Sequence, residues 1–441
     1  MGGRTKNLEP MDTLQYLLAL ETFGIKFGLK NVRTICTALG QPQTKYRSAL
    51  IAGTNGKGSV TAMVDRALLA AGLKVGRYTS PHLIRLEERF SINGRSVETP
   101  VLIEVIDEVR RLVDTLLARG TLDSPPTFFE VTTVVAFELF RRAQVDFAVL
   151  EVGLGGRLDS TNIVEPVAAA ITSIDFDHEQ YLGNTLAAIA AEKAGVIRTG
   201  IPIIVGPVLP EAREVLVSAC GAARADFVDA AGGAQVDVET TQGRTSIALR
   251  TPTRDYGRIP LRLRGSHQVP NAVVAVRLLE HLEQFLPVGP DAIVSGLRDV
   301  EWPGRLQMVE AESGRRVLLD AAHNPAGARA LATYLKQEFP EPLPFVFGAM
   351  RDKDAALMIT TLLPVAARMV MTEPHNARAR SSEELAALAR QVAPSCRVEV
   401  VPEPKDALNR AWTECPLVCA AGSVFLVGDI LSSLGGSVRS V

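Results

Sequence analysis

The stretch SALIAGTNGKGS (48–59), followed by VTAMVDRALLAAG (60–72), decides the fold of the first part of the chain. It predicts a buried strand that runs into a glycine-rich loop, with a lysine and a hydroxyl just before a helix. Glycines allow backbone N–H groups to turn towards an anion, and a helix N-terminus attracts negative charge. The arrangement therefore indicates a nucleotide-phosphate site, with Lys57 at the β- and γ-phosphates and the Ser59 hydroxyl on Mg²⁺. The residues expected to bind the nucleotide here are Gly53, Thr54, Asn55, Gly56, Lys57, Gly58 and Ser59.

This loop departs from the usual phosphate-loop pattern G-x-x-x-x-G-K-[ST] at two places. Ile51 stands where the first glycine belongs, and Gly58 separates Lys57 from Ser59. The alternative interpretation is a glycine-rich turn that caps a helix, but the strand before it favours phosphate binding. The loop alone does not choose among kinase, GTPase and ligase. A guanine-reading Asn-Lys-x-Asp run is absent, since the nearest string, RDKD (351–354), begins with arginine.

The rest of the chain repeats one rhythm, in which short apolar runs alternate with longer helical patterns. This rhythm predicts an α/β fold of parallel sheets with helices on both faces and with sites at the carboxyl ends of the strands. The runs expected to be strands are SALIAGTNG (48–56), DFAVLEVG (146–153), VAAAITSI (167–174), IPIIVG (201–206), RVLLDAAHN (316–324), PFVFGAM (344–350), RMVMTEP (368–374) and SVFLVGD (423–429).

Two domains are expected. Pro303-Gly304, between a helical stretch and a fresh alternating strand, marks a boundary. We predict a large phosphate-loop α/β domain with a mostly parallel sheet over 1–298, a linker at 299–303, and a smaller Rossmann-like α/β domain over 304–441. The stretch 226–265 has alternating polar residues and is expected to form a β-rich flap on the large domain.

The net charge and the hydropathy of the chain limit the kinds of partner that it can bind. The 441 residues carry a net charge of -2, which argues against nucleic acid or an anionic membrane. No run reaches the ~20 apolar residues of a membrane span, and the N-terminus lacks the apolar core of a signal peptide. We therefore expect a cytoplasmic protein that acts on small molecules. A monomer is expected, although no feature of the sequence specifies the oligomeric state. Its five cysteines are expected to be unpaired thiols of a reducing compartment: Cys36, Cys220, Cys396, Cys415 and Cys419.

Twelve blocks of sequence, in order along the chain after residue 15, resemble the folylpolyglutamate synthase and dihydrofolate synthase family, which is related to the Mur ligases. One such block would be weak, but twelve collinear blocks are specific. The blocks are GTNGKGSV (53–60), TSPHL (79–83), ERFSING (88–94), FFEVTT (128–133), EVGLGGRLDSTN (151–162), ITSIDFDHEQYLGNT (171–185), EKAGVI (192–197), HQVPNA (267–272), WPGR (302–305), DAAHNPAG (320–327), RDKD (351–354) and GSVFLV (422–427).

The resemblance implies a reaction in which ATP phosphorylates a carboxylate and the amine of L-glutamate attacks the acyl phosphate. Phosphorylation is needed because a carboxylate oxygen is a poor leaving group, and Mg²⁺ and cationic side chains offset the charge. The acceptor would be a folate, dihydropteroate or both, since the same motifs serve each. A Mur-type cell-wall ligase is the alternative, but TSPHL and FFEVTT look folate-specific. A nucleotide-switch protein is the alternative outside the ligases.

The resemblance also assigns metal and substrate residues. Ser59, Glu151 and His178 correspond to ligands of two Mg²⁺ ions. Without the resemblance, Glu151 could instead brace its loop, and a lone histidine is more often structural. Asp159 matches the pterin-binding part of the family site. The loop residues Pro81, His82 and Leu83 look like folate contacts, or else form a structural corner.

Four residues on either side of the predicted domain boundary correspond to positions that reach ATP from the C-terminal side. Asp320 and His323 follow the expected strand RVLLD, and Asn271 and Arg305 flank the boundary. Without the resemblance, Asn271 would be read as a helix cap and Arg305 as a surface ion pair. Two departures from the family pattern are Ala321, where glycine is frequent, and the extra acid Asp175.

The environment of Lys193 can be predicted partly from the spacing of the residues around it. The stretch NTLAAIAAEKAGVI (184–197) predicts a helix capped by Asn184 or Thr185, and Lys193 falls on its apolar stripe. A lysine placed there must snorkel, pair or lose its charge. In the family the matching lysine is carbamylated and organises the second Mg²⁺ site. The resemblance therefore implies carbamylated Lys193, which with Lys57 and His178 makes up the expected catalytic set.

Overall fold

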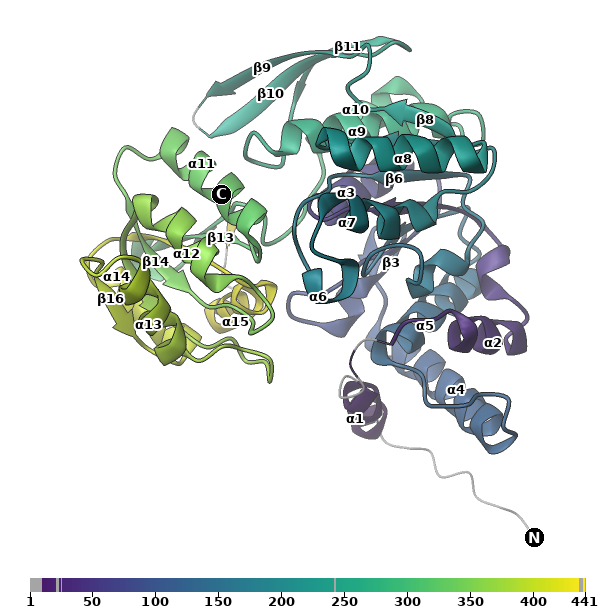
Figure 1. The fold of residues 1–441 in the computed structure, drawn as a ribbon, viewed down its shortest axis with the longest axis horizontal. Coiled ribbons are helices and arrows are strands. Elements are labelled where there is room, and N and C mark those ends of the chain that lie inside the picture. The colour runs from purple at the N-terminus through teal and green to yellow at the C-terminus, as the bar shows by residue number, and fades with distance from the viewer. Residues whose placement is uncertain (1–9, 21–23, 25, 242, 436–438, 441) are drawn as a thin grey trace.

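The structure of the chain is a computed structural model that describes residues 10–20, 24, 26–241, 243–435 and 439–440. Its first half is built on an eight-stranded sheet in the order β4-β3-β2-β5-β1-β6-β7-β8 (Figure 1). Five of the strand pairs are parallel, and only β3 and β4 run antiparallel to their neighbours. The strands are β1 (Arg47–Ala52), β2 (Val75–Tyr78), β3 (Phe90–Ile92), β4 (Arg95–Ser96), β5 (Phe147–Glu151), β6 (Ala168–Ile171), β7 (Pro202–Val205) and β8 (Asp226–Asp229).

Helices cover both faces of this sheet because its central strands are apolar on both sides. In β1, Leu50 and Ala52 face one core and Ala49 and Ile51 face the other, as the two-residue period of a strand requires. The first core is closed by α1 (Pro10–Ala19), α2 (Lys30–Ala38), α4 (Thr99–Ala118), α5 (Phe128–Ala143), α7 (Leu186–Lys193) and α8 (Pro210–Ala223), and the second by α3 (Lys57–Ala70), α9 (Gln268–Leu282) and α10 (Pro290–Arg298). The short α6 (Glu179–Leu182) lies at the carboxyl end of the sheet.

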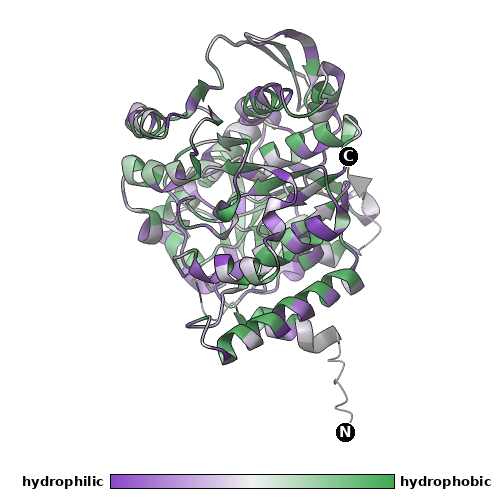
Figure 2. Ribbon diagram, turned by 90° about the vertical axis from the view of Figure 1, so that its right-hand side faces the viewer, coloured by the Kyte–Doolittle hydropathy of each residue, from purple (hydrophilic) through white to green (hydrophobic). Residues whose placement is uncertain are grey.

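The second half of the chain is built on a seven-stranded sheet in the order β16-β15-β14-β17-β13-β12-β18. Its strands are β12 (Gln307–Glu310), β13 (Arg316–Asp320), β14 (Leu343–Phe347), β15 (Ala366–Met371), β16 (Val398–Val400), β17 (Leu417–Ala421) and β18 (Arg439–Ser440). One face packs on α11 (Pro325–Glu338), α12 (Ala355–Leu362) and α13 (Ser382–Val392), and the other on α14 (Pro404–Trp412) and α15 (Val424–Leu434). The surface helices of both halves carry hydrophilic and hydrophobic residues side by side (Figure 2). The expected α/β fold is therefore confirmed.

The flap expected at 226–265 is confirmed in its centre and wrong at its start. An antiparallel sheet of β9 (Gln235–Thr241), β10 (Arg244–Arg250) and β11 (Asp255–Pro260) projects from the large sheet domain towards α11 (Figure 1). Residues 226–229 are instead β8, the parallel edge strand of the large sheet. The remaining short elements are the 3₁₀ turns Pro42–Thr44, Leu86–Arg89, Ser160–Ile163, Ala194–Val196, Glu312–Gly314 and Leu363–Val365.

One expected strand is wrong. The segment SVFLVGD (423–429) begins the helix α15, and the strand is the preceding LVCAA, β17. Gly422 ends that strand at φ 117°, and the Ser423 side chain accepts a hydrogen bond from the Phe425 backbone, which caps the helix. A run of four apolar residues fits a buried helix as well as a strand, so periodicity alone could not separate them. The other seven expected strands are confirmed.

None of the described helices is both long and apolar enough to cross a lipid bilayer.

Candidate active site

Two cavities lie where the carboxyl ends of both sheets face each other. The larger, of about 700 Å³, contains the phosphate loop on one side and the start of α11 on the other. The smaller, of about 450 Å³, lies between the 79–84 loop, Trp302 and α15. The two cavities share a wall made of Gly58, Ser80, Pro81, Glu151, Arg305, Ala321 and Val424.

The phosphate loop joins β1 to α3 in a conformation that only glycine tolerates. Gly53 has φ 144° and Gly56 has φ 86°, and a Cβ on Gly56 would lie 2.3 Å from Asn271 Oδ1. The additional glycine of this loop also has a reason, because a Cβ on Gly58 would lie 2.9 Å from the Trp302 ring. The glycine at position 58, which is absent from the usual loop pattern, therefore makes room for the Trp302 ring.

Lys57 begins α3 and folds back over its own loop. Its Nζ donates to the backbone oxygens of Gly53 and Thr54, both at 3.0 Å. Burial lowers the pKa of Lys57, while the charges of Glu151 and Asp177 act in the opposite direction. The ammonium group thus lies at the wall of the larger cavity, held by two carbonyl oxygens of its own loop.

The expected metal ligands lie on separate elements around the larger cavity. The Ser59 hydroxyl is 3.3 Å from Gln268 Nε2, and Glu151, which is 5% exposed, accepts from the Ser80 backbone at 3.2 Å. His178 is the N-cap residue of α6 and lies beyond the end of β6 at Ile171. Within the described ranges, no three His, Cys, Asp or Glu side chains form a metal-holding group.

The donors nevertheless fit Mg²⁺ if ligands of other kinds complete the set. Burial lowers the pKa of His178 to about 4, so its ring is neutral at physiological pH. Its Nδ1 is buried, with no hydrogen-bond partner among the described residues. The Ser59 hydroxyl and the Glu151 carboxylate supply oxygen atoms of the kind that Mg²⁺ prefers.

Lys193 is the last residue of α7, and its burial is as the spacing predicts. Thr185 caps the helix by accepting from the Ala188 backbone. The Lys193 side chain is 3% exposed, and its Nζ donates to the Gly53 backbone oxygen at 2.9 Å. Burial, and then the positive charge of Lys57, lower the pKa of Lys193 to about 7. Part of this amine is therefore unprotonated, and nucleophilic, at neutral pH.

The expected folate-contacting loop lines the smaller cavity with Pro81, His82 and Leu83. Arg89 Nε donates to His82 Nδ1 at 2.9 Å, and burial together with the Arg89 charge lowers the pKa of His82 to about 4. His82 is thus neutral, and its remaining ring hydrogen is on Nε2. A neutral donor of this kind suits a carbonyl or carboxylate oxygen of a ligand.

Unlike the 79–84 loop, Asp159 does not line the smaller cavity. Its buried carboxylate accepts from the Leu154 backbone at 2.8 Å and from the Thr161 backbone at 3.0 Å. These bonds brace the turn whose Gly153 and Leu154 line the larger cavity. A direct contact between Asp159 and a pterin stays a prediction.

The four residues expected to reach ATP from the C-terminal side all line the larger cavity: Asn271, Arg305, Asp320 and His323. Asp320 accepts from the backbone of Leu306 and of Ala322, each at 2.9 Å, so it ties the segment after Arg305 to the end of β13. His323 Nδ1 is 2.9 Å from the Ala321 backbone oxygen. Three further polar residues at this cleft had been given no role from the sequence: Asp177, Asn324 and Lys353.

A phosphate loop at a cleft closed by a second α/β domain is the architecture of the Mur ligases, which are ATP-dependent ligases. The chain matches the Mur ligase middle domain over residues 51–279 and the Mur ligase glutamate ligase domain over residues 304–427. It is also 33% identical to a dihydrofolate synthase/folylpolyglutamate synthase of Bacillus subtilis, across 93% of this chain and 96% of that protein.

Solved structures agree with this match. The Mycobacterium tuberculosis folylpolyglutamate synthase complexed with ADP and AMPPCP has a TM-score of 0.90 at 33% identity, covering 98% of this chain and 100% of that one. A folylpolyglutamate synthase complex with AMPPCP and folate has a TM-score of 0.81 at 29% identity, covering 97% and 100%. The chain belongs to the folylpolyglutamate synthase/dihydrofolate synthase family, which confirms the ligase class expected from its motifs.

Proposed function

We propose that this chain joins L-glutamate to the carboxylate of a folate, of dihydropteroate or of both, by way of an acyl phosphate made from ATP. The observation that carries the proposal is the wall shared by the two cavities, where Glu151 and Arg305 lie between the phosphate loop and the 79–84 loop. Occupants of the two cavities would meet at this wall, as transfer of a phosphoryl group requires.

The position of each residue assigns it to one of the two reactants. ATP occupies the larger cavity, with its phosphates on Gly53–Ser59 and Lys57. Asn271 lies beside this loop, and Asp320 and His323 approach from the second sheet. The acceptor occupies the smaller cavity, where Pro81 and Leu83 give an apolar contact and His82 donates from Nε2. Arg305, at the shared wall, then faces the acceptor carboxylate and stabilises the charge of the transferred phosphoryl group.

Ser59, Glu151, His178 and carbamylated Lys193 would hold Mg²⁺, at two sites. Carbamylation adds CO₂ to the neutral amine and releases one proton, which turns a buried cation into an anionic oxygen ligand. The pKa of about 7 supports this, because it supplies the neutral amine. When bound, Mg²⁺ would offset the charge on the phosphate oxygens.

A single chain in the cytoplasm is the proposed working form. Both cavities are lined by residues of one chain, so a monomer can hold every reactant. All five cysteines are unpaired, in keeping with a reducing compartment. We also propose the domain limits 1–298 and 304–441 with 299–303 as the linker.

A matrix of acceptors tests the proposal. Purified protein with ATP, Mg²⁺ and labelled L-glutamate would be given dihydropteroate, tetrahydrofolate or a uridine-diphosphate muramoyl peptide. We expect label to join dihydropteroate, tetrahydrofolate or both, and ADP to form in step. Label on the muramoyl peptide alone, or ATP turnover without any amide, would contradict the proposal.

A further inference from the structure

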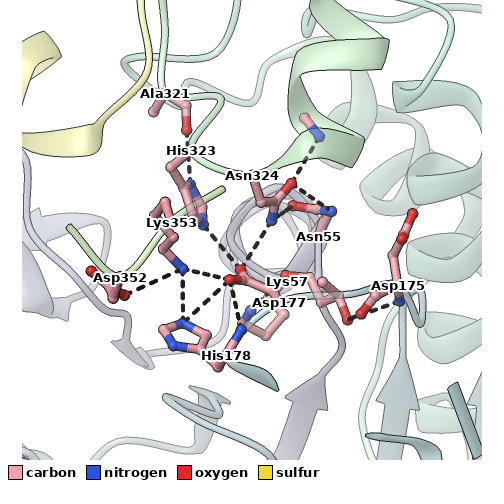
Figure 3. A network of polar contacts seen from close by, with 12 residues as sticks. Asn55, Lys57, Asp175, Asp177, His178, Ala321, His323, Asn324, Asp352 and Lys353 are labelled. Carbon is pink, nitrogen blue, oxygen red and sulfur yellow. Dashed lines mark hydrogen bonds and ion pairs between the residues drawn. The ribbon is translucent and has the colours of Figure 1, made fainter. Parts of the chain in front are cut away.

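Asp177, in the loop between β6 and α6, accepts from two donors of the other domain and lies near a histidine of that domain (Figure 3). Its Oδ1 is 2.5 Å from Lys353 Nζ, and its Oδ2 is 3.0 Å from Asn324 Nδ2 and 3.6 Å from His323 Nε2. The donors come from two separate loops, one after β13 and one after β14. One carboxylate of the first domain therefore holds two loops of the second.

These contacts are shielded from water. The side chains of Asp177 and Lys353 are each 8% exposed. A charge that is buried to this degree is costly unless it is paired. Loss of Lys353 removes the nearest cation from Asp177, and loss of Asp177 leaves Lys353 with the more distant carboxylate of Asp352, at 3.9 Å. The pair can only form when the two domains are in contact, which makes domain contact a condition for its stability.

The network also reaches the phosphate loop and the expected metal ligand. Asn324, which donates to Asp177, is 3.0 Å from Asn55 Oδ1 and caps α11 through the Gly327 backbone. Lys353 Nζ is 3.2 Å from His178 Nε2. Asp177 thus stands between the nucleotide loop, the start of α11 and the lysine of the second domain.

We propose that Asp177 is the positioning residue that docks the second domain onto the phosphate loop, so that the cleft is closed while the acyl phosphate exists. The inference rests on the proposed function. Closure is needed because water competes with the glutamate amine for an acyl phosphate, and a closed cleft excludes water. Without Asp177, the intermediate is exposed to hydrolysis: water attacks the acyl carbon, phosphate leaves, and the acceptor carboxylate is regenerated without an amide.

The same loop offers a matched control. Asp175 also crosses the cleft, with Oδ2 at 2.7 Å from Arg329 NH2, but the side chains are 32% and 53% exposed. An exposed pair of this kind contributes little, because solvent screens both charges. Asp175→Asn and Asp177→Asn therefore remove the same chemical group from the same loop, one at the surface and one in the buried network.

The first test measures coupling, which is the number of phosphates released per amide formed. Replacement of a residue with a purely structural role would leave this ratio unchanged. We expect Asp177→Asn to lower kcat by at least ~30-fold, to change the KM for the acceptor less than ~3-fold, and to release more than one phosphate per amide formed. Asp175→Asn should stay within ~3-fold of wild type and keep one phosphate per amide. Unaltered coupling in Asp177→Asn, or equal effects of the two variants, would overturn the inference.

The second test does not depend on ligase activity, so its failure differs from failure of the proposed function. Small-angle scattering of the full chain with AMPPCP and Mg²⁺ reports closure. Asp177→Asn and Lys353→Met should each leave a larger radius of gyration than wild type, and the double variant should be no larger than either single one. Additive increases, or a wild-type radius in Asp177→Asn, would show that the pair does not dock the domains. Circular dichroism and melting temperature check that each variant is folded.

Discussion

At the scale of single residues, two lysines end at the same carbonyl oxygen of the phosphate loop. Gly53 O accepts from Lys57 Nζ at 3.0 Å and from Lys193 Nζ at 2.9 Å. Two buried ammonium groups at this separation repel each other strongly. Burial lowers the pKa of both lysines, and that of Lys193 falls to about 7. Lys193 can therefore give up its proton near neutral pH, which the proposed carbamylation requires.

Two replacements of Lys193 test whether the site uses an anionic carbamate or a cation at this position. We expect Lys193→Ala to be nearly inactive and to regain part of its activity with formate or acetate, which can occupy the space of a carbamate. Lys193→Arg keeps the positive charge and should stay inactive in the same ligation assay. An active Lys193→Arg enzyme would mean that the site uses a cation.

The lowered pKa of Lys193 also predicts a pH dependence of stability. The amine titrates at 10.5 when exposed and at about 7 in the folded chain. Between these values the unfolded chain binds more protons than the folded chain, so the free energy of unfolding rises with pH. In CO₂-free buffer, urea unfolding should give a higher free energy at about pH 9 than at about pH 7. Lys193→Met should lose most of this rise, and a rise equal to that of wild type would refute the assignment.

At the scale of elements, the sequence predicts best where local chemistry and burial agree. The helix around Lys193 is an example, because a threonine cap and an apolar stripe both indicate it, and the structure places α7 from Leu186 to Lys193. The prediction fails at SVFLVGD, since its four apolar residues fit a strand or a helix and the decision depends on Gly422 and Ser423. The position of His178 at the start of α6 could not be predicted, because the hydrophobic periodicity of the sequence does not report the length of the loop after β6.

The cap of α7 should matter for the element that presents Lys193. The Thr185 side chain accepts from the Ala188 backbone at 3.1 Å. We expect Thr185→Ala to lower the free energy of unfolding by about 1 kcal/mol, while Thr185→Ser, which keeps the acceptor, stays close to wild type. Urea unfolding of both variants measures this. Equal stability of the alanine and serine variants would show that the cap contributes nothing.

At the scale of the whole molecule, the site is completed by contacts between distant parts of the chain. Asp177 and Lys353 are 176 positions apart, and Asn55 and Asn324 are 269 apart. No spacing or periodicity in a single sequence reports such pairs, which is why the phosphate loop could be predicted and this network could not. The roles of the two domains at one cleft follow only from their arrangement in space.

Second-domain residues should therefore affect ATP more than the acceptor. We expect Asp320→Ala and His323→Ala to lower kcat/KM for ATP by ~10- to 100-fold, because the first frees the segment at Leu306 and the second removes a contact at the cleft. The affinity for the acceptor, measured by calorimetry on the full chain, should change less than ~3-fold. Normal KM and kcat for ATP in both variants would contradict a nucleotide held between the domains.

The central claim is that the acceptor carboxylate is activated as an acyl phosphate, and an isotope transfer tests it most directly. The acceptor, with oxygen-18 in its reacting carboxylate, would be converted with ATP, Mg²⁺ and L-glutamate, and the released phosphate examined by mass spectrometry. The account predicts that each amide formed transfers one labelled oxygen from the carboxylate to inorganic phosphate. Amide formation with no label in the phosphate would show that the bond is made without an acyl phosphate and would contradict the account.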